Sequence, residues 1–503
     1  MKNINLRIVS AAILSAIVSS LAACGGGAAE TPPPADGAAD TGAQTETAAE
    51  TESPDAETDP YEPDSLPSDL DLGGRTVTVL GWNHYEDTPE FYAAELTGDV
   101  VNDAFYYRNL GVEERLNMKL QFLEADARGD EIANKVNSSV MSGAGEYDIT
   151  AAHSHRACLM ASRGLDLDLT KLGYIDFDKP WWAQKLRSTA SVGNTLCYAT
   201  GDICISSISR TQGIFFNQDY IKNFGLGDPY DFVLDGSWTL DKMISMTPGV
   251  YADLDGNAKK NEADQFGFCA DAVQLQAVFY TSGLRSVDHN EDGSLTISSE
   301  IAGEKAVALL EKMGEFMKNN ENSIVIKTTD DDSIFSQGRA LFYAFPLGII
   351  SSGRFRGAGF DIGFVPWPKY EESDANYTIN ISNAYSMWQI PIDAKNAEES
   401  AAVMEALASA GYRTTSPALF ETAYKVKYNN IDAMRQSQVY DILRQDISFD
   451  ISRIFTVLSF SANQFGDMIA NNRQKWVSTV EKSSSKFQAA LDSLVETFEG
   501  FEN

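Results

Sequence analysis

The chain has 503 residues, of which 22% are charged, and its formal net charge is −33 at pH 7. This acidic balance, with no basic cluster, argues against nucleic acid as a partner, because nothing is available to displace the counterions of phosphates. Five cysteines are too few for a disulfide framework in a chain of this length. No repeat with a period of about 20 to 50 residues occurs, which argues against a solenoid or a propeller.

The first 23 residues predict a bacterial export signal. Lys2 and Arg7 are its only charges, and the apolar stretch after them is shorter than the roughly 20 residues that span a bilayer. The sequence Leu-Ala-Ala-Cys-Gly at 21–25 resembles the lipobox of bacterial lipoproteins. That resemblance implies that Cys24 is lipidated and becomes the mature N-terminus, which places the protein at the extracellular face of the cell membrane. The alternative is a secreted protein with a chance cysteine at the cleavage site.

Residues 24–72 are predicted to be a disordered tether. After the cysteine they contain thirteen acidic residues and neither Lys nor Arg, a composition that does not fold and that extends by charge repulsion. Removal of the leader, with its two basic residues, changes the net charge to −35, and −22 of this belongs to the chain beyond the tether. The remaining 430 or so residues exceed what one core supports, so we expect two lobes.

The first part of this folded region alternates between strand and helix patterns. Strands are expected at 76–80, 119–123 and 147–152, and helices at 100–116 and 131–141. This alternation predicts a parallel, doubly wound sheet. Ligands of such sheets lie beyond the carboxyl ends of the strands. The candidates in those places are Trp82, Asn83 and His84, then Asp126, then His153, Ser154 and His155.

Motifs further along the chain resemble one known family. They are Lys-Pro-Trp-Trp at 179–182, Gly-Ile-Phe-Phe-Asn-Gln-Asp at 213–219, Asp-Pro-Tyr at 228–230, Gly-Ser-Trp-Thr-Leu-Asp at 236–241, Gln-Gly-Arg-Ala-Leu-Phe at 337–342, Val-Pro-Trp-Pro-Lys at 365–369, Lys-Tyr at 427–428 and Asp-Ile-Leu at 441–443. Their order and spacing resemble the extracellular solute-binding proteins of ATP-binding-cassette (ABC) importers, family 1, carbohydrate type. Gln218 departs from the lysine that is usual there.

The resemblance implies the type II periplasmic-binding-protein fold, in which two α/β lobes with doubly wound sheets are joined by crossing hinge strands. We expect the crossings near 206–216 and 362–365. Lobe 1 is then 73–206 plus 367–412, and lobe 2 is 207–366 plus 413–503. The implied function is to capture a solute, most simply a sugar, and to deliver it to the permease of an ABC importer. We expect a monomer that is not an enzyme, with calcium as the one cofactor to consider.

A sugar offers an apolar face to aromatic rings and hydroxyls to polar side chains. The rings that we predict to stack on it are Trp82, Tyr343, Phe345, Trp367 and Trp388; the alternative for each is a buried core position, which we favour for Trp388. For the hydroxyls we predict Asn83, Asp126, His153 and Asn217. Asn217 has an alternative role as the cap of a helix that begins near residue 219.

One acidic loop has the spacing of a calcium site. Its oxygen ligands at loop positions 1, 3, 5, 9 and 12 are Asp253, Asp255, Asn257, Asn261 and Asp264. Ala258 stands at the sixth position, where calcium loops have glycine, so a polar hairpin is the alternative. The sequence at 288–293 is similar but favours an Asp-Gly turn between two strands.

Two further alternatives stay open at this stage. The common catalytic motifs are absent, but a carboxylate pair of a surface-anchored glycoside hydrolase is not excluded by sequence, and a peptide or another small solute could replace the sugar. Cys197 and Cys204 are either bonded across a hairpin or, as we favour, two buried thiols. Residues 472–498 are expected to form an amphipathic helix that packs on lobe 2.

Overall fold

The computed structural model describes residues 62–83, 90–126, 129–328, 331–425, 433–445, 447–458 and 463–500. The predicted leader, the lipidation site Cys24, most of the tether and His84 lie outside these residues. Within them, no helix is both long enough and apolar enough to cross a membrane.

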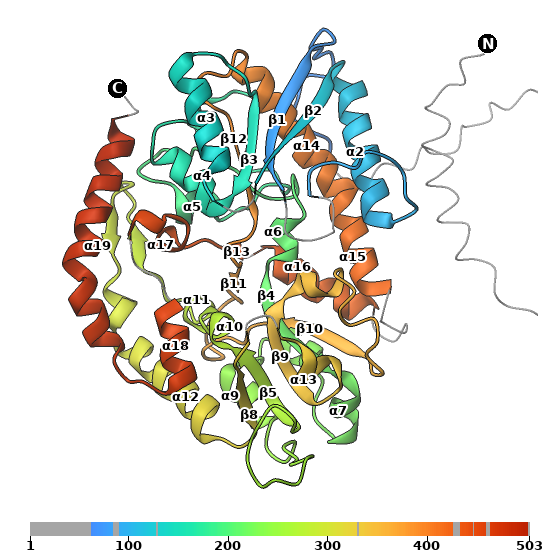
Figure 1. Ribbon diagram of the computed structural model, residues 1–503, viewed down its shortest axis with the longest axis vertical. Coiled ribbons are helices and arrows are strands. Elements are labelled where there is room, and N and C mark those ends of the chain that lie inside the picture. Colours follow the sequence, from blue (N-terminus) through green and yellow to red (C-terminus); the bar gives the residue numbers. More distant parts are fainter. Residues whose placement is uncertain are drawn as a thin grey trace, which may run out of the picture. The chain divides into compact units, whose positions relative to one another are not determined.

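The first sheet has the strand order β12-β3-β1-β2. Its three parallel strands are β1 (Thr76–Trp82), β2 (Lys119–Ala125) and β3 (Ile149–His153), and β12 (Ser386–Gln389) pairs with β3 in the antiparallel sense. Its helices are α2 (Val100–Leu116), α3 (Glu131–Ser142), α4 (Ser154–Ala161) and α14 (Ala397–Arg413). Figure 1 shows α3 and α4 on one side of this sheet and α2 and α14 on the other. The predicted doubly wound sheet is therefore confirmed.

Helix α2 shows why the sequence folds in this way. Asp99 caps it by accepting hydrogen bonds from the backbone N–H groups of Val101 and Asn102. Asn117 ends it in the left-handed conformation, with φ 48°. The residues of its buried face, at helical spacing, include Val101, Phe105, Val112 and Leu116.

The second sheet has the strand order β10-β4-β9-β5-β8. Its strands are β4 (Gln212–Asn217), β5 (Phe266–Asp271), β8 (Ser323–Ile326), β9 (Ala340–Pro346) and β10 (Ile362–Pro366). Strands β8, β5 and β9 are parallel, and β4 runs antiparallel beside β9. The first sheet thus has a parallel core of three strands plus the antiparallel β12, and the second has a parallel core of three strands plus β4 and β10, with β4 antiparallel to both of its neighbours.

The chain passes between the sheets at two places. The first passage runs from Ala199, which bridges to Trp388 in the first sheet, through α6 (Ser206–Ser209) to β4. The second does not lie at 362–365 as predicted, because these residues pair with β4 as strand β10. It lies between 367 and 386, where Ile381 bridges to Thr211. Helix α15 (Thr415–Lys425) then packs on α2 of the first half. The lobe limits themselves stay predictions.

The C-terminal part contains α16 (Ala433–Gln445), α17 (Ile451–Ile454), α18 (Asn463–Asn471) and α19 (Trp476–Glu499). Helix α19 buries the apolar stripe that we predicted, and the Trp476 indole donates to the backbone oxygen of Ile301 at 2.5 Å. The Asp-Gly turn at 288–293 joins β6 (Val287–His289) to β7 (Leu295–Ile297), as expected. Cys197 and Cys204 are buried thiols without a disulfide bond.

Candidate functional site

The carboxyl ends of the three parallel strands of the first sheet lie along one edge. Trp82 at the end of β1 is in register with Ala125 of β2, and Gly81 is in register with Ala151 of β3. The residues that follow are therefore neighbours, as predicted. Asn83 and Asp126 are exposed and His153 is half-buried, so these side chains reach solvent at this edge.

Two histidines extend this edge into helix α4. The ring of His153 lies 5.2 Å from that of Trp82 and 5.0 Å from that of His155. His153 Nδ1 accepts the backbone N–H of His155 at 3.2 Å, so the hydrogen of the neutral ring sits on Nε2. His155 Nε2 donates to the backbone oxygen of Arg453 at 3.0 Å, and burial lowers the pKa of His155. Helix α4 is thereby joined to α17.

Arg453 ties the first sheet to the chain segment that returns from the second. Its Nε donates to Asn383 Oδ1 at 2.7 Å, and its Nη1 donates to Asn380 Oδ1. Ser154 Oγ donates to the backbone oxygen of Asn383 at 2.6 Å. We call His153, His155, Asn380, Asn383 and Arg453 the strand-end cluster.

Hydrogen bonds continue from this cluster into the second half. Asn380 donates to the side chain of Gln212 at the start of β4, and Gln212 donates to Gln274 at 2.6 Å. Gln274 belongs to α10 (Ala272–Leu275), which directly follows β5. A chain of polar contacts therefore runs from the strand ends of one sheet to those of the other. The sequence signal for it was slight: an arginine in the otherwise mostly apolar run 451–455.

The predicted stacking rings are corrected by the structure. Trp82, Tyr343 and Trp367 are each 1% exposed, Trp388 is 0% exposed and Phe345 is 8% exposed. Their faces pack in the protein core: Tyr343 stacks between Phe335 and Phe345, Trp367 packs on Phe268, and Trp388 packs on Phe91. The prediction that these rings stack on a ligand is therefore wrong. They are core residues, which was the alternative, and their faces are not open to a ligand.

Two of the predicted polar residues are also occupied in other ways. Asn217 is 1% exposed, and its side-chain oxygen accepts the backbone N–H groups of Asp219 and Tyr220, so it caps helix α7 (Gln218–Asn223). Ser154 is fully buried beneath the edge. Asn83, Asp126 and His153 are the predicted residues that reach the edge with polar groups, whereas His84 lies outside the described residues.

A buried carboxyl group joins both passages between the sheets. Glu90 is 5% exposed, and it accepts hydrogen bonds from Ser386 Oγ at 2.5 Å, from the Ser206 hydroxyl, and from Ser206 N at 3.2 Å. Ser386 Oγ also accepts the Trp82 indole N–H at 2.9 Å. Burial raises the pKa of Glu90 to about 7, although Ser206, Ser386 and the charge of Arg210 lower it.

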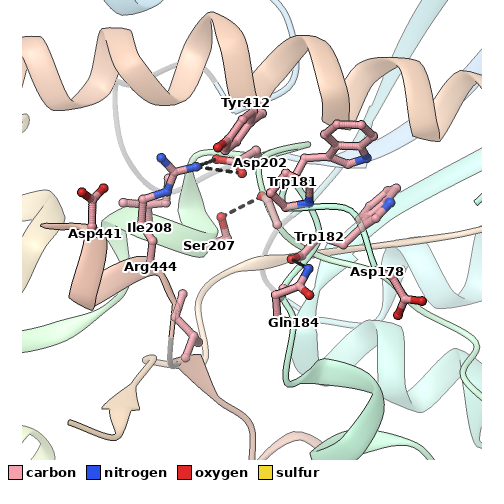
Figure 2. Close-up of a pocket in the computed structure, with 14 residues that line it drawn as sticks. Asp178, Trp181, Trp182, Gln184, Asp202, Ser207, Ile208, Tyr412, Asp441 and Arg444 are labelled. Atoms are coloured by element: carbon pink, nitrogen blue, oxygen red, sulfur yellow. Dashed lines mark hydrogen bonds and ion pairs between the residues drawn. The ribbon is translucent and has the colours of Figure 1, made fainter. Parts of the chain in front are cut away.

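A cavity of about 340 Å³ lies beside the first passage. Figure 2 shows its charged wall, where Arg444 of α16 bonds Asp202 through Nη2 at 2.9 and 3.0 Å. The indole rings of Trp181 and Trp182 point away from the cavity in Figure 2, and both donate to Glu405, at 3.2 and 2.8 Å. We call this space the hinge cavity. Its lining includes none of the residues at the strand ends, so we do not assign the ligand to it.

The calcium-like loop has a suitable oxygen set. Carboxylate oxygens of Asp253, Asp255 and Asp264 lie within 4.8 Å of one another. Ala258 adopts φ 56°, the left-handed conformation that glycine usually supplies at the sixth position. The side chains of Asn257 and Asn261 donate to Asp255, the latter at 3.1 Å. Oxygen ligands fit a hard cation, and calcium binding stays a prediction.

No known sequence family matches the chain, and no curated protein matches it. Solved structures share its fold. A cyclo/maltodextrin-binding protein complexed with maltotetraose is 12% identical, covers 84% of this chain and 96% of its own length, and has a TM-score of 0.52. UgpB from Mycobacterium tuberculosis, in complex with glycerophosphocholine, is 14% identical, covers 82% and 98%, and has a TM-score of 0.53. The predicted two-lobed periplasmic-binding-protein fold is thereby confirmed.

Proposed function

We propose that this protein captures an extracellular solute, a sugar or an oligosaccharide, and delivers it unchanged to the permease of an ABC importer. The observation that carries the proposal is the polar chain between the strand ends of the two sheets, in a fold shared with solute-binding proteins. Ligands of open α/β sheets bind in that place. The maltotetraose complex of one structural neighbour supports a carbohydrate.

In this proposal the exposed polar groups of the edge bind the hydroxyl groups of the sugar. The carboxylate of Asp126 accepts hydrogen bonds, the amide of Asn83 both donates and accepts, and His153 donates from Nε2. A ligand shifts the lobes from open to closed only by binding the closed form more tightly. Contacts to both halves provide such a difference. Lipidation of Cys24 would hold the protein outside the cell, near the permease.

Thermal unfolding of the mature chain with mono- and oligosaccharides tests the proposal. A ligand at 100 times its dissociation constant should stabilise the protein by about 2.7 kcal/mol, a clear rise in melting temperature. The oligosaccharide should be recovered intact. A shift with peptides and with no carbohydrate would contradict the sugar assignment. Hydrolysis of the oligosaccharide would favour the alternative, a surface glycoside hydrolase.

The same melting experiment, with and without calcium, tests the acidic loop. We expect calcium to raise the melting temperature of the wild-type chain but not that of the Asp253→Asn variant, which lacks a charged ligand. Asp292→Asn is the matched control, because Asp292 lies in the other Asp-Gly turn, where it bonds Ser294. It should respond to calcium as the wild type does. An equal response of both variants, or none in the wild type, contradicts the calcium assignment.

A further inference from the structure

Arg453 differs from the other members of the strand-end cluster because it carries a buried charge. The residue is 8% exposed, and its guanidinium group lies 5.2 Å from the ring centre of Tyr280. Among the residues that the structure describes, no carboxylate forms an ion pair with it. The acidic neighbour in sequence, Asp450, instead accepts hydrogen bonds from Ser286 and Ser452. Burial lowers the pKa of Arg453 and the charge of Asp450 raises it, but no carboxylate of the described chain pairs directly with the guanidinium group.

The hydrogen bonds of Arg453 leave part of the guanidinium group unused. Its Nε and Nη1 each donate to an amide oxygen, of Asn383 and Asn380. A guanidinium group has more N–H donors than these contacts use, and no acceptor among the described residues takes those on Nη2. The edge formed by Nη1 and Nη2 is the one that binds a carboxylate or a phosphate through parallel hydrogen bonds.

Burying a cation without a directly paired anion costs free energy, and neutral amide oxygens offset only part of that cost. An anionic group that enters with the ligand would offset the rest. The folded region is strongly acidic, with a net charge of −22 beyond the tether, so attraction for an anion must come from a local cation. The cluster offers the guanidinium group of Arg453 as that cation.

We propose that the solute captured at the strand-end cluster carries an anionic group, a carboxylate or a phosphate, which pairs with Arg453. This inference rests on the proposed function, because it concerns the same site. A uronic acid or a sugar phosphate has the required chemistry. A neutral sugar of the same size lacks the group that neutralises Arg453 and binds more weakly.

Calorimetric titration of the mature chain with three probes tests the inference: an oligogalacturonate, the neutral oligosaccharide of the same linkage, and a hexose phosphate. We expect the oligogalacturonate or the phosphate to bind at least about tenfold more tightly than the neutral probe, with an advantage that shrinks at high salt. Which of the two binds identifies the anion. Equal binding of charged and neutral probes overturns the inference and leaves the proposed function standing. No binding of any probe counts against both.

Variants of Arg453 test whether this residue pairs with the anionic group of the solute. Arg453→Gln should lose about tenfold or more in affinity for the anionic probe, with little change for the neutral one. Arg453→Lys keeps the charge but lacks the planar guanidinium group that forms two parallel hydrogen bonds, so its affinity for the anionic probe should be intermediate. Arg156→Gln is the matched control, because Arg156 lies on the same edge but already pairs with Asp130 at 3.0 Å. Equal losses for both probes in a variant that still melts cooperatively would show a structural role and overturn the inference.

Discussion

Replacing Arg444 with methionine is expected to lower the free energy of unfolding by about 3 kcal/mol. Arg444 makes two hydrogen bonds to Asp202, whose side chain is 7% exposed. Burial raises the pKa of Asp202, and the charge of Arg444 is the main factor that lowers it. Without the arginine, the buried carboxylate keeps the hydroxyl of Ser416 as its one side-chain donor among the described residues. Chemical denaturation at neutral pH measures the loss.

The matched control lies on the same helix. Arg435 pairs with Asp228 and Asp231 at the surface, so Arg435→Met should cost less than about 1 kcal/mol. The double variant Arg444→Met with Asp202→Asn should recover part of the loss, because it removes the uncompensated charge. Similar small losses for Arg435→Met and Arg444→Met would contradict the role of this ion pair in holding the hinge cavity.

The second prediction concerns Glu90 and pH. Its pKa is about 7 in the folded protein against 4.5 for an unperturbed glutamate, because the carboxyl group is buried. A raised pKa means that the unfolded chain loses the proton first. Ionisation therefore stabilises the unfolded state as the pH rises from 4.5 to about 7, and the stability present at low pH is lost over this window. The difference in pKa corresponds to about 3 kcal/mol.

Glu90→Gln isolates this contribution, since glutamine does not titrate. The free energy of unfolding of the wild type, minus that of the variant, should fall by about 3 kcal/mol between pH 4.5 and pH 7 and then stay level. Two ionisable groups that interact with Glu90 do not titrate in this window: burial raises the pKa of Cys204 to about 12 and lowers that of Arg108 only to about 10. A difference that is constant with pH would contradict the assignment.

The sequence predicted the first sheet well because its signals are local. The period of the apolar pattern identified α2 with its observed bounds, and β1, β2 and β3 followed from their apolar runs. The exposed candidates Asn83 and Asp126 came from the same argument, since the carboxyl ends of parallel strands share one edge. The N-cap alternative for Asn217 was also correct, because the cap is read from adjacent residues.

The failures concern contacts between distant parts of the chain. A tryptophan at a strand end looks the same in sequence whether its ring faces a ligand or, as for Trp82, donates to Ser386. The segment 362–365 was read as a passage between lobes, but it pairs along its whole length with β4, which lies far away in sequence. Arg453 and Asn383 meet only in the folded chain, so no local pattern marks them.

The measurement that tests the central claim most directly is hydrogen exchange of the mature chain, with and without the saccharide that raises its melting temperature. The account predicts slower amide exchange on both sides of the strand-end cluster, in residues 149–161 and in residues 379–383 and 447–454. Protection confined to the segments around the hinge cavity, or to one sheet alone, would contradict capture between the strand ends of the two sheets.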